Sequence, residues 1–221
     1  MTLDLQQQQM TLWQHVIDGG FSAPYTIASL FDSLQNGPGM NLQPNQKRPS
    51  LDEVMAYQNE RVIGSFLKTF AMPVDEARDI FEQLKRMLWL TNEMDYDGLH
   101  ADEYAFSIDH SLQILDEMWH TFILCTKDYQ AFCLDTFGYF LHHSPTVESD
   151  AEQAARKAEF AGLSEAQAIV KIADQKRWQY TYVFKKLGKD VFIKWYTGYH
   201  QTYTARHLLD LRLKMLSTAN Q

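Results

Sequence analysis

The hydrophobic positions of this chain recur mostly at intervals of three and four residues, which is the spacing of one face of an α-helix. The clearest stripe lies between residues 75 and 94 and consists of Ile80, Phe81, Leu84, Met87, Leu88 and Met94. No stretch shows the alternation with a period of two that is typical of half-buried strands. The pattern therefore predicts a compact all-α fold of about seven to nine helices without a significant sheet.

Capping and helix-breaking residues divide these stripes into separate elements. Ser50 followed by Glu53 has the spacing of a capping box and predicts a helix that runs from residue 51 to about residue 70. Pro73 ends this helix, because proline lacks the backbone N–H that a helix interior needs. Near the C-terminus, Gly188 is expected to break a long helix, because helices commonly end at a glycine.

The length of 221 residues suits one domain with a core that needs neither disulfides nor a structural metal. We therefore predict a single helical domain over residues 1–221. Residues 35–49, QNGPGMNLQPNQKRP, are rich in glycine, proline and asparagine, and we predict a mobile loop there. A cluster in the C-terminal region repeats at intervals of four residues and could line an aromatic pocket, but core packing is the better interpretation. Its members are Trp195, Tyr196, Tyr199, His200, Tyr203 and His207.

Charge and cysteine content exclude several classes of protein. The net charge of −8 argues against nucleic-acid binding, which needs basic groups to neutralise phosphates, and the lysines near 176 and 185 suit a solvated helix face. The chain shows no apolar run of membrane-spanning length and no signal peptide. With only two cysteines it has no disulfide framework, so we expect a cytoplasmic protein with reduced thiols. Its partner is left open as an unknown protein or small molecule.

Most residue types with reactive side chains gather between residues 115 and 145, LDEMWHTFILCTKDYQAFCLDTFGYFLHHSP. Asp116 and His120 lie four residues apart, so both fall on one side of the predicted helix, at the flank of its apolar stripe. A carboxylate and an imidazole in this arrangement can share a metal, or the carboxylate can orient the imidazole. A local hydrogen bond at the edge of the core is the simpler interpretation.

Cys133 and the pair His142–His143 add further ligand types to the same stretch. Cysteine and histidine both bind zinc, iron and copper. Their spacing is not that of a zinc finger, and Cys133 taken alone is better explained as a small core residue on the face of Tyr129 and Phe132. Cys125 and Cys133 are not expected to form a disulfide in a reducing compartment.

The common catalytic motifs are missing from the sequence. It contains no phosphate-binding loop, no dinucleotide-binding glycine pattern, no nucleophile elbow and no HExxH zinc motif. Nucleotide hydrolysis and the standard hydrolase mechanisms are therefore disfavoured.

The stretch from 115 to 145 resembles the characteristic block of the glycine-rich domain-containing protein-like family. The chain is similar to a short, bacterial-type member without the glycine-rich region, since its 10 glycines are scattered. Cys125 departs from the pattern, because the family often has aspartate there. The resemblance implies no defined reaction, but it implies that the ligand-type residues meet in space. The matching residues are Asp116, Trp119, His120, Thr126, Tyr129, Phe132, Cys133, Gly138, His142, His143 and Pro145.

We therefore predict a polar site built from Asp116, His120, Cys133 and His143 that binds a transition metal, zinc or iron, or supports catalysis. In a catalytic site His120 would be the acid–base residue or a ligand, with Asp116 orienting it. Two other hypotheses stay open. The block could be structural, within a protein–protein interaction module, or it could belong to a small-molecule enzyme without a metal.

Overall fold

The computed structural model describes residues 42–99, 106–143, 154, 157–158 and 160–219. Within these ranges lie eight α-helices, one π-helical segment and no strand, which confirms the all-α prediction. No helix in the same ranges combines the length and apolar character that a bilayer crossing requires. The elements are α3 (Leu51–Met55), α4 (Glu60–Leu67), α5 (Val74–Tyr96), α6 (Gln113–Leu124), α7 (Thr126–Thr136), α9 (Glu165–Ile193), η1 (Lys194–Tyr199), α10 (His200–Thr202) and α11 (Ala205–Ala219).

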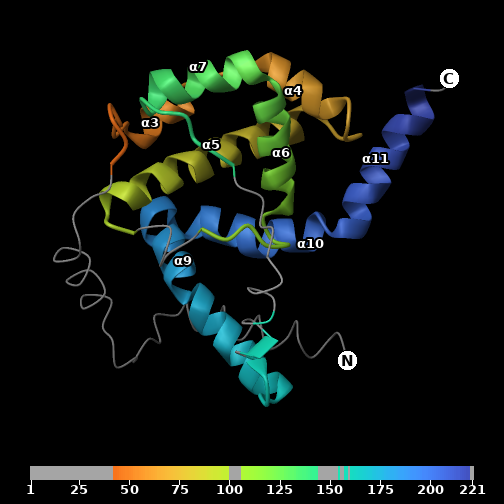
Figure 1. The fold of residues 1–221 in the computed structure, drawn as a ribbon. Helices are drawn as coiled ribbons and strands as arrows, with labels where there is room; N and C mark the ends of the chain where they lie inside the picture. Colours follow the sequence, from red (N-terminus) through yellow and green to blue (C-terminus); the bar gives the residue numbers. More distant parts are fainter. Residues whose placement is uncertain (1–41, 100–105, 144–153, 155–156, 159, 220–221) are drawn as a thin grey trace.

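Helix α5 runs through the middle of the fold. In Figure 1 α3, α4 and α7 lie above it, α9 and α10 lie below it, and α6 crosses it. It contacts α3, α4, α6 and α9 directly. Its core side is the stripe predicted from the sequence, and Ile80, Leu84, Met87 and Leu88 are fully buried. The long apolar face of α5 therefore organises the other helices around it.

The first helix predicted from the sequence is in fact two, and that boundary prediction is wrong. The capping box that begins α3 is present, but the chain leaves the helix after Met55. The Nζ atom of Lys85, on α5, donates to the carbonyl oxygens of Met55 and Tyr57 at 2.7 and 2.6 Å. Asn59 then begins α4 by accepting from the backbone N–H of Arg61 at 3.0 Å. The contact with Lys85, far along the chain, thus ends α3 at a point where no nearby proline or glycine would end it.

The break predicted at Gly188 is confirmed. This residue has φ +83° and ψ 174°, so α9 consists of two helical segments joined at a kink. The segment after the kink continues into the π-helical turn η1, which buries Trp195, Tyr196 and Tyr199. The tryptophan and the tyrosines of the predicted cluster, Tyr203 included, are therefore core, whereas His200 and His207 are only half-buried.

The segment before α3 is held against α5 in its described part. Gln46 Nε2 donates to Asn92 at 3.1 Å, and the indole N–H of Trp89 donates to the carbonyl of Pro49 at 3.0 Å. Residues 35–41 of the predicted mobile loop lie outside the described residues. The mobility of the loop as a whole stays a prediction.

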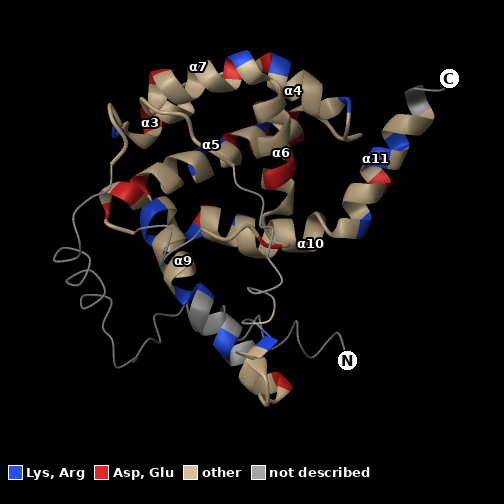
Figure 2. Ribbon diagram, in the orientation of Figure 1, with Lys and Arg blue, Asp and Glu red and all other residues tan. Residues whose placement is uncertain are grey.

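An ion network joins this segment, the end of α5 and α9. Glu93 is bound by Arg48 at 2.9 Å and by Lys186 at 3.1 Å, and Lys186 also reaches Asp97 at 2.6 Å. Figure 2 shows the acidic end of α5 beside basic positions of α9. These cations hold the pKa of Glu93 below its usual value, although burial acts against them. Lys186, one of the basic groups of α9, thus stabilises the fold.

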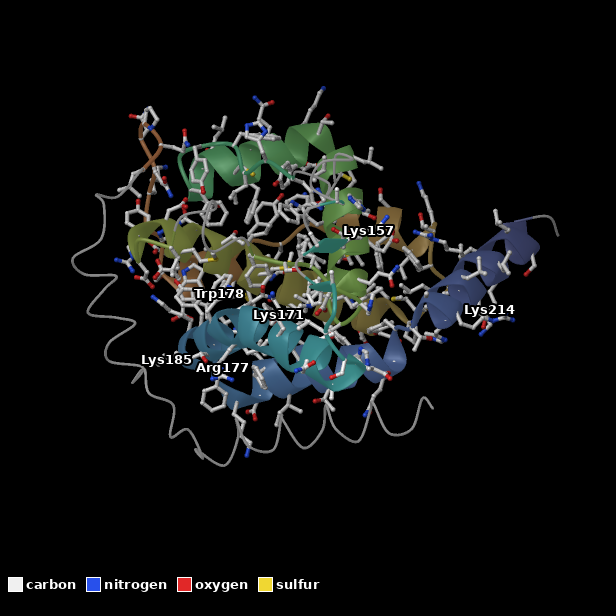
Figure 3. The ribbon with its side chains drawn as sticks, turned by 60° about the horizontal axis from the view of Figure 1, so that its bottom comes forward. Lys157, Lys171, Arg177, Trp178, Lys185 and Lys214 are labelled. Atoms are coloured by element: carbon white, nitrogen blue, oxygen red, sulfur yellow. The ribbon has the colours of Figure 1, made fainter. Side chains whose placement is uncertain are left out.

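The remaining basic residues of the C-terminal half do not gather in one place. In Figure 3 Lys171, Arg177 and Lys185 follow one another along α9, and Lys214 lies apart on α11. Of the positions that the sequence assigns to a solvated helix face, Arg177, Lys185 and Lys189 are exposed. Lys176 and Lys186 differ, because they form ion pairs with Asp109 and with Glu93 and Asp97, respectively.

Gly138 lies where a side chain would not fit. Its φ is +78°, and a Cβ atom there would stand 2.0 Å from the carbonyl oxygen of Asn45. Gly138→Ala is therefore expected to lower the free energy of unfolding by about 3 kcal/mol, from backbone strain and overpacking together. Urea denaturation measures the loss.

Gly162 provides a matched control, because it also has φ +78° but nothing lies within 4 Å of the position of its Cβ. Gly162→Ala should cost only the backbone strain, about 1 kcal/mol. Equal losses in the two variants would contradict the steric explanation.

Candidate metal centre

Helix α6 supplies two of the ligand-type residues from its outer flank. Asp116 and His120 lie one turn apart, with side chains that are 27% and 49% exposed. The opposite face of the helix buries Leu115, Met118 and Phe122. The structure thus confirms the position predicted from periodicity, beside the core and open to solvent.

The segment after α7 brings His143 to the same place. After the turn at Gly138 the chain passes back along α6, and the imidazole of His143 becomes only 12% exposed. Its Nε2 donates to Asp116 Oδ1 at 2.8 Å. His120 Nδ1 lies 3.7 Å from the other oxygen, Asp116 Oδ2, and the two imidazole rings are 4.7 Å apart between centroids. One carboxylate therefore stands between two imidazoles.

The three side chains form a group with the dimensions of a metal site. One ligand atom from each of Asp116, His120 and His143 lies within 4.8 Å of the others, and the described residues contain no second group of this kind. Ligands about 2.1 Å from a tetrahedral ion are about 3.4 Å from one another. Small side-chain movements would bring the three atoms to that spacing, so the residues fit a transition metal.

A buried hydrogen-bond network stands behind this cluster. The indole N–H of Trp119 donates to the hydroxyl of Tyr129 at 2.9 Å, and that hydroxyl donates to the carbonyl of Leu141 at 2.6 Å. The edge of the Trp119 ring packs against His143, with 4.4 Å between centroids. The network therefore connects α6, α7 and the segment that carries His143.

Cys133, the fourth predicted site residue, is not brought into the cluster. Its side chain is completely buried on α7, beside the backbone N–H of Leu141 and the hydroxyl of Tyr129. Burial raises the pKa of the thiol, which disfavours the thiolate that metals bind. The site that the structure assembles therefore has three of the four predicted members, because Cys133 points into the core.

Two neighbouring residues of the block also lie outside the cluster. The ring of His142 packs on Phe140, with 4.9 Å between centroids. Cys125 joins α6 to α7, and its sulfur lies 3.9 Å from the hydroxyl of Ser65. Both cysteines are free, so the disulfide that the sequence disfavours is not formed.

The hydrogen bond between Tyr129 and Leu141 was not predicted from the sequence. The sequence did contain a signal for Tyr129: it is four residues from Cys133, so the two residues lie on one face of α7. No signal pointed to Leu141, which takes part through its backbone alone. The pairing of Asp116 with His143, 27 residues apart, likewise had no local signature.

Comparison with known proteins gives one partial match. A family model described as UCP032817-like matches residues 75–160. The matched range contains α6, α7 and all three members of the cluster. No match was found to a curated protein or to a solved structure.

Proposed function

We propose that Asp116, His120 and His143 bind one divalent transition-metal ion, zinc or iron. The observation that carries this proposal is the carboxylate of Asp116 placed between two imidazoles, with ligand atoms within 4.8 Å of one another. Two histidines with one carboxylate are a ligand set that suits both metals. Binding would displace the proton through which His143 now bonds Asp116, because a ligating imidazole nitrogen must be free.

The cluster suits an accessible site. Three protein ligands leave coordination positions for water or a substrate, as in catalytic zinc and iron sites. The imidazole of His120 is about half exposed, so a small molecule could reach the ion from its side. When bound, the metal would supply Lewis acidity and an activated water.

The same geometry supports a version of the site that acts without a metal. The short hydrogen bond of Asp116 goes to His143, at 2.8 Å, while His120 is 3.7 Å away. In this version Asp116 would orient His143, and the more exposed His120 would be the acid–base residue. The hypothesis from sequence had Asp116 orienting His120; in this version Asp116 orients His143 instead.

An interaction module with a structural block is the alternative function. The buried positions and mutual hydrogen bonds of Trp119, Tyr129 and Cys133 favour it for that part of the block. A purely structural block does not explain why the exposed imidazole of His120 lies 3.7 Å from the carboxylate of Asp116. Metal binding distinguishes the two functions.

Family and location complete the proposal. The block that resembles the glycine-rich domain-containing protein-like family lies within the range of the matched family model, and we propose a common origin with that family. A cytoplasmic location is supported by the two free cysteines, which a reducing compartment preserves. Subcellular fractionation would test the location.

The metal proposal is tested by elemental analysis after repletion with zinc or with iron(II) under anaerobic conditions. We expect one ion per wild-type chain. His143→Ala should weaken binding by more than about a hundredfold, because even residues that only support a ligand contribute about ten- to a hundredfold. His142→Ala is the matched control, since this neighbour is outside the cluster, and it should bind like the wild type. Equal binding by both variants would contradict the proposed ligand set.

A further inference from the structure

Both backbone polar groups of Leu141 lie beside side chains of one helix. Its carbonyl accepts a hydrogen bond from the hydroxyl of Tyr129 at 2.6 Å. Burial raises the pKa of the Cys133 thiol, and the N–H of Leu141 and the hydroxyl of Tyr129 beside it act against that rise. Tyr129 and Cys133 are one turn apart on α7, and both are buried. A segment without regular secondary structure is therefore held at a single residue, by the hydrogen bond from Tyr129 and by the neighbouring side chain of Cys133.

The hydroxyl of Tyr129 also reaches α6. It accepts from the indole N–H of Trp119 at 2.9 Å while it donates to Leu141. Trp119 directly precedes His120, and Leu141 lies two residues before His143. A single buried hydroxyl thus touches both segments that carry members of the cluster.

Two further contacts restrict His143. The ring of Trp119 packs edge-on against its imidazole at 4.4 Å between centroids. At the other end of the segment, the carbonyl of Phe137 accepts from the backbone N–H of Lys47 at 2.7 Å. The chain between Phe137 and His143 is consequently held at its start, at Leu141 and at its end.

Packing alone does not explain why a hydroxyl group is buried at Tyr129. A phenylalanine would fill nearly the same space as Tyr129, and α7 already places Phe132 in the same core. Burying a hydroxyl costs free energy unless it is hydrogen-bonded, so the bonds of Tyr129 must be formed for the fold to tolerate it. The bonds made here are those that fix the position of Leu141 relative to α6.

We propose that Tyr129 and Cys133 are positioning residues, which hold Leu141 and so keep the imidazole of His143 beside Asp116 and His120, where all three can reach one metal ion. This inference rests on the proposed metal function of the cluster. It assigns the cysteine of the block a role beside the site, as a support for one of its ligands. Supporting partners of metal ligands are typically worth ten- to a hundredfold in affinity.

The test uses cobalt(II) as the probe, because its visible absorption reports coordination geometry, and the full-length protein. Tyr129→Phe should weaken cobalt binding about tenfold or more and change the shape of the absorption bands. Tyr139→Phe is the matched control, since this tyrosine lies on the same segment but its hydroxyl faces Asp95 at 3.4 Å. The control should keep the affinity and the spectrum of the wild type.

Cys133 provides an independent pair of variants should Tyr129→Phe fail to fold. Cys133→Ala removes the sulfur beside the Leu141 N–H, whereas Cys133→Ser restores an acceptor there. Cobalt affinity and spectrum should change in the first and return toward the wild type in the second. An alanine variant that matches the wild type in both would overturn the role of Cys133.

A measurement on the metal-free protein separates this inference from the metal proposal. The imidazole N–H signal of His143, bonded to Asp116, should be visible by nuclear magnetic resonance in the wild type and in Tyr139→Phe. It should be lost to exchange with water in Tyr129→Phe. If Tyr129→Phe loses this signal and the wild type does not bind cobalt, the positioning of His143 would be supported and the metal function contradicted. A folded Tyr129→Phe variant with unchanged signal, affinity and spectrum would overturn the positioning role.

Discussion

Raising the pH above about 10 is expected to unfold the protein in one cooperative step. The cause is a set of tyrosines whose hydroxyls are buried, and for each of them burial raises the pKa above the ordinary value of 10.0. Carboxylates raise some of these pKa values further, such as Asp97 beside Tyr182 and Glu76 beside Tyr203. The five most deeply buried of these residues are Tyr129, Tyr182, Tyr196, Tyr199 and Tyr203.

The sign follows from the order in which the two states lose protons. Above the ordinary pKa the unfolded chain ionises its tyrosines while the folded chain keeps them neutral, so stability is lost as the pH rises. Each retained proton costs about 1.4 kcal/mol per pH unit, and five together cost about 7 kcal/mol per unit. Typical stabilities of about 5–15 kcal/mol would be exhausted within one or two units. Lys85 acts in the opposite direction, because burial lowers its pKa, but it is a single group whose contribution is complete near its ordinary value of 10.5.

Circular dichroism and tyrosinate absorbance, followed through the same titration, measure this effect. We expect helix loss and tyrosine ionisation to occur together over about one pH unit. Gradual ionisation of the tyrosines with the helices intact would contradict their burial.

Replacement of Lys85 by methionine should lower the free energy of unfolding by about 3 kcal/mol. The ammonium group of Lys85 is fully buried and binds three oxygens, those of Met55, Tyr57 and Glu82, at 2.6 to 2.9 Å. Methionine fills similar space, but it leaves the two backbone carbonyls without a donor. Each such buried group costs about 1–3 kcal/mol, which outweighs the relief from removing a buried charge.

Lys47→Met is the control for this prediction. The ammonium of Lys47 also donates to a backbone carbonyl, that of Asp135 at 2.9 Å, but this residue is exposed. Water replaces the lost bond there, so the expected cost is below about 1 kcal/mol. Similar losses of unfolding free energy in the two variants would show that burial is not the cause.

The elements that local chemistry determines were predictable from the sequence. The apolar stripe of α5, the capping box at Ser50 and the break at Gly188 each depend on residues within a few positions of one another, and all three were confirmed. The end of α3 was not predictable, because Lys85, about thirty residues further along the chain, binds the carbonyl of Met55. Contacts of this range leave no periodic pattern in the sequence. The start of α4 at Asn59 did have a local capping signal.

The candidate site divides in the same way. The placement of Asp116 and His120 beside the core follows from helical geometry alone. That His143 joins them depends on the turn at Gly138 and on the bonds to Leu141, which only the folded chain reveals. Cys133 fits both a ligand and a core residue as a residue type, and its burial favours the second.

The most direct measurement of the central claim is the anomalous scattering of crystals grown with zinc or cobalt. The proposal requires a peak about 2.0–2.2 Å from a carboxylate oxygen of Asp116 and from one nitrogen each of His120 and His143. Under saturating metal, the absence of a peak there, with His143 still hydrogen-bonded to Asp116, would contradict it.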